Sequence, residues 1–92
     1  MGATNIWSKT LTGSTLTVSA SQNVVRISIL ASTGPVTILG TSVFNGIPSD
    51  AVTFATGQGV TLTASSTANP IDGITIDASA GGAVADIVLS YQ

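Results

Sequence analysis

The stretch NVVRISILA, residues 23–31, decides the fold class because it carries the clearest β-strand pattern in the chain. Valine and isoleucine suit a pleated strand, and alternate side chains of a strand point to opposite faces. One face would carry Val25, Ile27 and Ile29. The other face would carry Val24, Arg26, Ser28 and Leu30, so it is half apolar as well.

Segments of the same kind recur along the chain, and no stretch shows a convincing helical period. Strands are expected at Thr4–Leu11, Ser14–Val18, Asn23–Ala31, Val36–Leu39, Ser42–Phe44, Ala51–Phe54, Val60–Thr63, Ile71–Asp77 and Ala83–Tyr91. Turn signals separate them at intervals of about 8–12 residues, which is typical of sandwiches, jelly rolls and small barrels. We therefore predict one all-β domain over residues 1–92, a compact antiparallel β-sandwich or jelly roll of about eight short strands. Residues 1–10 would form an edge strand or an extended N-terminal arm.

The composition favours a protein that associates with copies of itself or with a larger particle. The 92 residues are 43% hydrophobic and only 7% charged, with a net charge of −2 and no cysteine. An ordinary soluble domain is about 25% charged. Because so little charge favours association over solitary solubility, we expect a homo-oligomer or a subunit docked on a larger particle.

Several functional classes are disfavoured by the side chains that are missing. Lys9 and Arg26 are the whole supply of cations, too few to neutralise nucleic-acid phosphates. No apolar run approaches the roughly 18 residues of a membrane-spanning helix, and the N-terminus shows no signal-peptide pattern. With no His, Cys or Glu, a nucleophilic hydroxyl would lack a base. We predict no catalytic residue, no cofactor, no nucleic acid and no membrane partner.

The segment NPIDGITIDASAGG, residues 69–82, is the most acidic part of the chain. Calcium at Asp72, Asp77 and Asp86 is one hypothesis, since Ca²⁺ prefers oxygen ligands, but the spacing matches no EF-hand loop. The favoured interpretation is turn chemistry. Asp72-Gly73 would form one turn, Gly81-Gly82 another, and the remaining carboxylates would lie at edges or in solvent.

Three Thr-x-Thr pairs place hydroxyls on single strand faces, at Thr10/Thr12, Thr15/Thr17 and Thr61/Thr63. An ice-binding surface would need such rows, but at regular intervals. The alternative is that threonine forms strands well and covers a surface without charge.

The run GPVTILGTSVFNGIPSDAVTFATGQGVTLTA, residues 34–64, and the later NPIDGITIDASAGGAVADIVL, residues 69–89, resemble small all-β virion proteins of tailed bacteriophages. These include head-decoration (auxiliary capsid), head-fibre and tail-associated domains. The resemblance covers residues 23–90 and implies a symmetric oligomer, often a trimer, bound to a major capsid protein or to other virion proteins. It also implies assembly in the host cytoplasm and a final location in the virion.

Two functional hypotheses follow. The first is a non-enzymatic structural subunit that decorates or stabilises a capsid, with Ile6, Trp7, Val24 and Leu30 as interface candidates. Each of these residues could instead pack in the protein's own core. The second hypothesis is a receptor- or glycan-binding module, for which Trp7 and Tyr91 would provide the aromatic platform.

Overall fold

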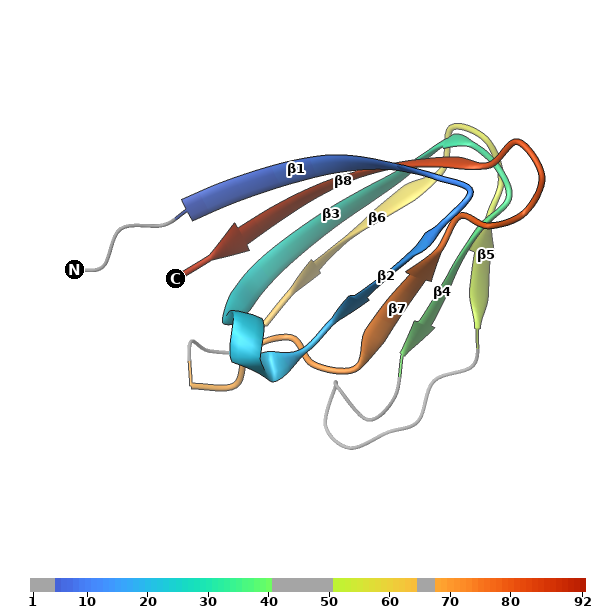
Figure 1. Cartoon of the computed structure of the whole chain (residues 1–92). Helices are drawn as coiled ribbons and strands as arrows, with labels where there is room; N and C mark the ends of the chain where they lie inside the picture. The colour runs from blue at the N-terminus through green and yellow to red at the C-terminus, as the bar shows by residue number, and fades with distance from the viewer. Residues whose placement is uncertain (1–4, 41–50, 65–67) are drawn as a thin grey trace.

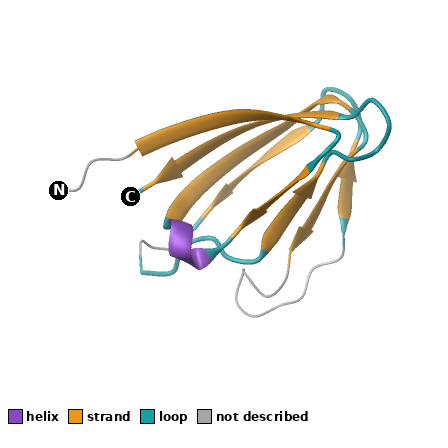
Figure 2. Ribbon diagram, viewed as in Figure 1, coloured by secondary structure: helices purple, strands orange, loops and turns teal. Residues whose placement is uncertain are grey.

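The computed structural model describes residues 5–40, 51–64 and 68–92 (Figure 1). Eight strands are assigned within these residues: β1 (Asn5–Thr12), β2 (Thr15–Val18), β3 (Val24–Thr33), β4 (Val36–Gly40), β5 (Val52–Phe54), β6 (Gly59–Thr63), β7 (Ile74–Asp77) and β8 (Val84–Tyr91). One 3-10 turn, η1 (Ala20–Gln22), precedes β3 (Figure 2). Within the described part, no helix is long and apolar enough to cross a membrane.

The strands form two antiparallel sheets that face each other. Sheet A has the order β1-β8-β3-β6, and sheet B has the order β2-β7-β4-β5. The pairing is nested, because β4 pairs with β5, β3 with β6, β2 with β7 and β1 with β8. All connections cross between the sheets except the one from β4 to β5. The predicted all-β antiparallel sandwich is confirmed.

Aliphatic side chains from the two inner faces fill the space between the sheets. The core consists of Leu11, Val18, Val24, Ile27, Ile29, Ala31, Val36, Ile38, Ile71, Ile74, Ile76, Ala78, Ala83, Ala85, Ile87 and Leu89. No polar or charged side chain of the described residues is buried. The strand alternation in the sequence thus translates directly into one apolar and one exposed face per sheet.

The N-terminal end of β3 differs from strict alternation. The register of β3 on β8 shifts between Val24 and Arg26, so Val25 is the extra residue of a β-bulge. The bulge turns Val24 into the core, where its side chain is 1% exposed, while Val25 is only half-buried. The prediction that Val24 shares a strand face with Leu30 is therefore wrong, because one inserted residue reverses the alternation.

The segment before β7 also departs from the expected pattern. We expected a strand from Ile71, but β7 begins at Ile74. Gly73 has a φ of +76°, which interrupts the extended backbone. Ile71 is nevertheless buried, and its N–H donates to the carbonyl oxygen of Val24 at 2.9 Å. The strand predicted at Ser42–Phe44 and the loop after it lie outside the described residues.

Candidate interaction surfaces

The outer face of sheet A carries a diagonal stripe of exposed aliphatic side chains. Val88 on β8 lies opposite Ser8 on β1 and Ser28 on β3. Ile6 and Leu30 occupy the diagonal positions on these flanking strands. Their side chains are 72% (Ile6), 43% (Val88) and 45% (Leu30) exposed. We call these three residues the aliphatic stripe.

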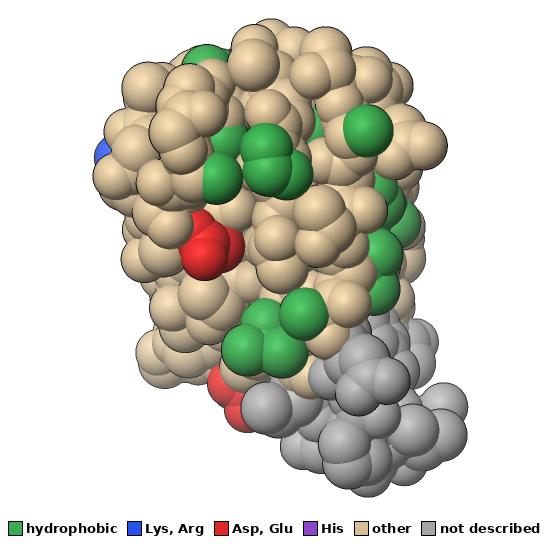
Figure 3. Space-filling view, turned by 90° about the vertical axis from the view of Figure 1, so that its right-hand side faces the viewer, with side chains coloured by type: hydrophobic (Ala, Val, Ile, Leu, Met, Phe, Trp, Pro, Cys, Tyr) green, Lys and Arg blue, Asp and Glu red, His purple; other side chains and the backbone are tan. Residues whose placement is uncertain are grey.

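Hydroxyl groups and few charges surround the aliphatic stripe. Thr10 donates to Asp86 Oδ1 at 2.9 Å, and the hydroxyls of Ser28 and Thr61 lie 3.2 Å apart. Gly59 lies opposite Leu30 and leaves a shallow hollow beside it. On the side of the molecule that Figure 3 shows, charged side chains are likewise few and hydrophobic side chains form separate patches.

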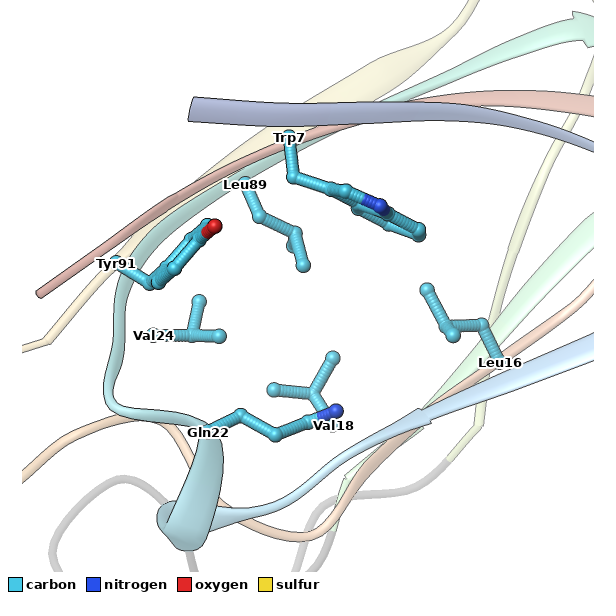
Figure 4. Close-up of a pocket in the computed structure, with 7 residues that line it drawn as sticks. All are labelled: Trp7, Leu16, Val18, Gln22, Val24, Leu89 and Tyr91. Atoms are coloured by element: carbon cyan, nitrogen blue, oxygen red, sulfur yellow. The ribbon is translucent and has the colours of Figure 1, made fainter. Parts of the chain in front are cut away.

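An apolar pocket opens between the two sheets near the start of β1, on the side where β1 and β2 are the edge strands. It has a volume of about 350 Å³ and is lined by Trp7, Leu16, Val18, Gln22, Val24, Leu89 and Tyr91. Figure 4 shows that Trp7 and Tyr91 approach the space from sheet A, while Leu16 and Val18 approach it from β2. We call this site the Trp7 pocket. Its size and its mixture of aromatic, aliphatic and amide groups are those of a small-ligand site.

Threonines cover much of the outer face of sheet B. The register places Thr15, Asp77, Thr37 and Thr53 in one cross-strand row, and Thr17, Thr75 and Leu39 in the next. The hydroxyl oxygens of Thr17 and Thr75 are 3.2 Å apart, as are those of Thr37 and Thr53. These hydroxyls bond to each other across strands, and Leu39 interrupts the second row. The regular free hydroxyl array that ice binding would need is therefore not formed here.

The three aspartates of the calcium hypothesis are not gathered into one site. Asp72 accepts a hydrogen bond from the N–H of Ala20, whereas Asp86 accepts one from Thr10. Asp77 accepts bonds from both the N–H and the hydroxyl of Ser79. Among the described residues, no group of three His, Cys, Asp or Glu side chains could hold a metal ion.

The Asp77 carboxylate stabilises the turn after β7. The Ser79 hydroxyl, followed by the Ser79 N–H, holds the pKa of Asp77 below its ordinary value of 3.8. Both donors favour the ionised form, because a hydrogen bond to a negatively charged carboxylate is stronger than one to the neutral acid. The turn then continues to Gly82, which has a φ of +79°, and the N–H of Ala83 donates to the oxygen of Ala80. A turn at Gly81-Gly82 was expected, but Asp77 was expected only as an edge or solvent charge, and its hydrogen bonds to Ser79 are an addition from the structure.

The four interface candidates take three different positions. Ile6 and Leu30 lie on the outer face of sheet A, Trp7 lies at the inter-sheet pocket, and Val24 lies in the core. Val88 was missed as an interface candidate, although the alternation of β8 already assigns it to the face opposite Ile87 and Leu89. Local alternation does not predict that β1, β8 and β3 are neighbours in one sheet, and this arrangement comes only from the structure.

No protein-family model and no curated protein sequence matches the chain. One solved structure, described as Bacillus endospore appendages that form a novel family of disulfide-linked pili, is similar with a TM-score of 0.48 and 20% identity. The alignment covers 98% of this chain and 85% of that chain. A likeness at this level assigns neither family nor function. The resemblance to bacteriophage virion proteins gains no support from these comparisons and stays a prediction.

Proposed function

We propose that this protein is a non-enzymatic structural subunit that works by associating with copies of itself through its outer surfaces. The aliphatic stripe carries the proposal, because Ile6, Val88 and Leu30 occupy neighbouring positions on three adjacent strands and are exposed on the outer face of sheet A. Contiguous exposed apolar side chains on a small protein mark interaction sites.

The low net charge of the protein also favours association between copies. A net charge of −2 gives little long-range repulsion between copies, and hydroxyl groups next to the stripe can be desolvated at lower cost than charged groups. The described residues thus offer an interface with an apolar centre and a polar rim made mostly of hydroxyl groups, in which the Asp86 carboxylate is hydrogen-bonded to Thr10. An apolar centre with a polar rim is the arrangement of a stable protein–protein contact.

The mass of the native protein tests this proposal. Light scattering coupled to size-exclusion chromatography should give a multiple of the 9.1 kDa chain. Val88→Thr and Leu30→Thr keep strand-forming residues but remove apolar contact area, so they should shift the equilibrium toward smaller species. Leu39→Thr is the matched control, because Leu39 is 49% exposed on the outer face of the opposite sheet. A wild-type monomer at high concentration would reject the proposal.

We further propose the more specific role of a bacteriophage decoration protein, with a trimer as the first stoichiometry to test. Support comes from the sequence resemblance over residues 23–90 and from the nested strand order β1-β8-β3-β6 and β2-β7-β4-β5. We infer that this order is the wrapping of a jelly roll, a fold that viral capsid domains use often. Co-sedimentation with undecorated capsids would test this role, and a protein that stays in the supernatant would count against it.

Recognition of a glycan is the second candidate function, and the Trp7 pocket favours it. Trp7 and Tyr91 offer ring faces for a sugar, while Gln22 accepts from Ser19 N–H through Oε1 and keeps its amide N–H groups for a ligand hydroxyl. Titration of Trp7 fluorescence with an oligosaccharide library should show saturable changes that Tyr91→Ala abolishes. Unchanged fluorescence across the library would remove this candidate.

A further inference from the structure

We propose that the free edge of β1 is a homotypic docking site, at which β1 of a second copy pairs antiparallel about a two-fold axis through Ser8. This inference rests on the proposed self-association and not on the trimer. A two-fold contact joins copies in pairs, so it would give a dimer or would link two trimers. Its occupant is a second copy of this chain, and its chemistry is backbone hydrogen bonding plus a contact between Trp7 and the partner's Lys9.

The first observation is the edge itself. β1 is the longest of the four edge strands, with 8 residues against 5 in β6, 4 in β2 and 3 in β5. Among the described strands, β1 pairs only with β8, so half of its backbone groups point away from the sheet (Figure 1). Its register on β8 runs unbroken from Asn5 to Thr12, and it contains no proline and no bulge. A long straight edge of this kind is a template for another strand.

The second observation is the pattern of side chains on β1, which selects one register. When two copies of one strand pair antiparallel about a two-fold axis, the axis passes midway between the same residue of the two copies, which lie directly opposite each other. Axes through Ser8 or Lys9 allow the most backbone pairs over Asn5–Thr12. An axis through Lys9 would place two ammonium groups directly opposite each other, which is destabilising. The axis through Ser8 avoids this and is therefore preferred.

The Ser8 register also brings complementary groups together. It places Trp7 opposite the partner's Lys9, Ile6 opposite Thr10 and Asn5 opposite Leu11, each pair occurring twice. Trp7 and Lys9 both lie on the inner side of sheet A, since they alternate with the outward-facing Ile6, Ser8 and Thr10. Lys9 has no ion-pair partner in the described part of the chain, and Trp7 is 37% exposed. An ammonium group over an indole face is an attractive contact.

A single-cysteine experiment tests the register in the full chain, which has no cysteine of its own. Ser8→Cys places two thiols at the axis, about 4.5–5.5 Å apart between Cα atoms, which suits a disulfide. Mild oxidation should therefore give a covalent dimer. Ile6→Cys and Thr10→Cys are matched controls on the same exposed face. Two copies of Ile6 would be about 14 Å apart, too far to bridge, whereas a mixture of the two variants should cross-link as a heterodimer.

The charge test uses the equilibrium association measured by sedimentation. Lys9→Met keeps the length and removes the charge, and it should weaken association roughly fivefold. Lys9→Arg should retain the wild-type affinity. Tighter association of Lys9→Met would mean that Lys9 guards the edge against pairing, which would overturn the inference. Oligomers without Ser8→Cys cross-linking would overturn the β1 contact alone, whereas a monomeric wild type would also reject the proposed function.

Discussion

Asp72 Oδ1 accepts a hydrogen bond of 2.9 Å from the backbone N–H of Ala20, a residue 52 positions earlier in the chain. The bond ties the start of η1 to the loop that leads into β7. In the same loop, the N–H of Gly73 donates to the oxygen of Val18 at 2.9 Å. Asp72, one of only four acidic residues in the chain, thus links the β2–β3 connection to the loop before β7 at one end of the sandwich.

Replacing Asp72 with alanine should lower the free energy of unfolding by about 1–2 kcal/mol, because the N–H of Ala20 loses a charged acceptor. Asp72→Asn keeps an oxygen acceptor and should cost less. Urea unfolding of the three proteins measures the difference.

Adding EDTA should leave the Tm of the wild type unchanged, since the three aspartates bind separate protein donors. A fall in Tm with EDTA would restore the calcium hypothesis.

Acid should destabilise the protein partly through Asp77. The folded-state pKa of Asp77 lies below 3.8, so its ionised form contributes stability that is fully present above the unfolded value. That contribution is lost as the pH falls below about 3.8 and through the folded pKa. Asp77→Asn should therefore flatten the fall of Tm as the pH drops below about 3.8. In an NMR titration, Ser79→Ala should raise the pKa of Asp77, and an unchanged value would disprove the role of the Ser79 hydroxyl.

A side chain at position 59 should destabilise the protein. A Cβ atom built on Gly59 would lie 2.5 Å from the carbonyl oxygen of Ile29, a backbone atom in the paired strand that cannot move away alone. We expect Gly59→Ala to destabilise the protein by about 1–3 kcal/mol, measured by urea unfolding. Gly81→Ala is the matched control, because nothing lies within 4 Å of its Cβ position. Equal stability of the two variants would show that β3 and β6 are not paired in this register.

Truncation of Val24 should lower the stability much more than truncation of Leu30, although strict alternation assigns the two residues to one strand face. Val24→Ala should cost about 2 kcal/mol of stability, since two buried methyl groups are lost and a cavity remains. Leu30→Ala should change monomer stability by less than about 0.5 kcal/mol, because its side chain is exposed. Unfolding midpoints measured under monomeric conditions compare the two. A large cost at Leu30 with none at Val24 would place the bulge elsewhere.

Much of the fold could be predicted from local pattern. The expected strand Val36–Leu39 matches β4 to within a residue, and Ala83–Tyr91 matches β8 equally well. Pro35 and Gly82 lie just before these segments, and alternating aliphatic residues fill them. The division of β8 into an inner face with Ile87 and Leu89 and an outer face with Asp86 and Val88 also follows from alternation alone.

The candidate surfaces were less predictable. The aliphatic stripe exists because Ile6, Val88 and Leu30 sit on adjacent strands, and those strands are separated by dozens of residues in the chain. The Trp7 pocket likewise needs two sheets to form. Local pattern identifies which side chains face outward, but it holds no information on which outward faces become neighbours.

The sequence by itself determined the all-β class, most turn positions among the described residues and the alternation of most strands, because these depend on interactions between residues close in the chain. Only the tertiary structure decided the nested strand order, the bulge that buries Val24 and the neighbours of Val88. Those features depend on long-range pairing, in which one inserted residue reverses a face and one choice of neighbouring strand creates or removes a surface.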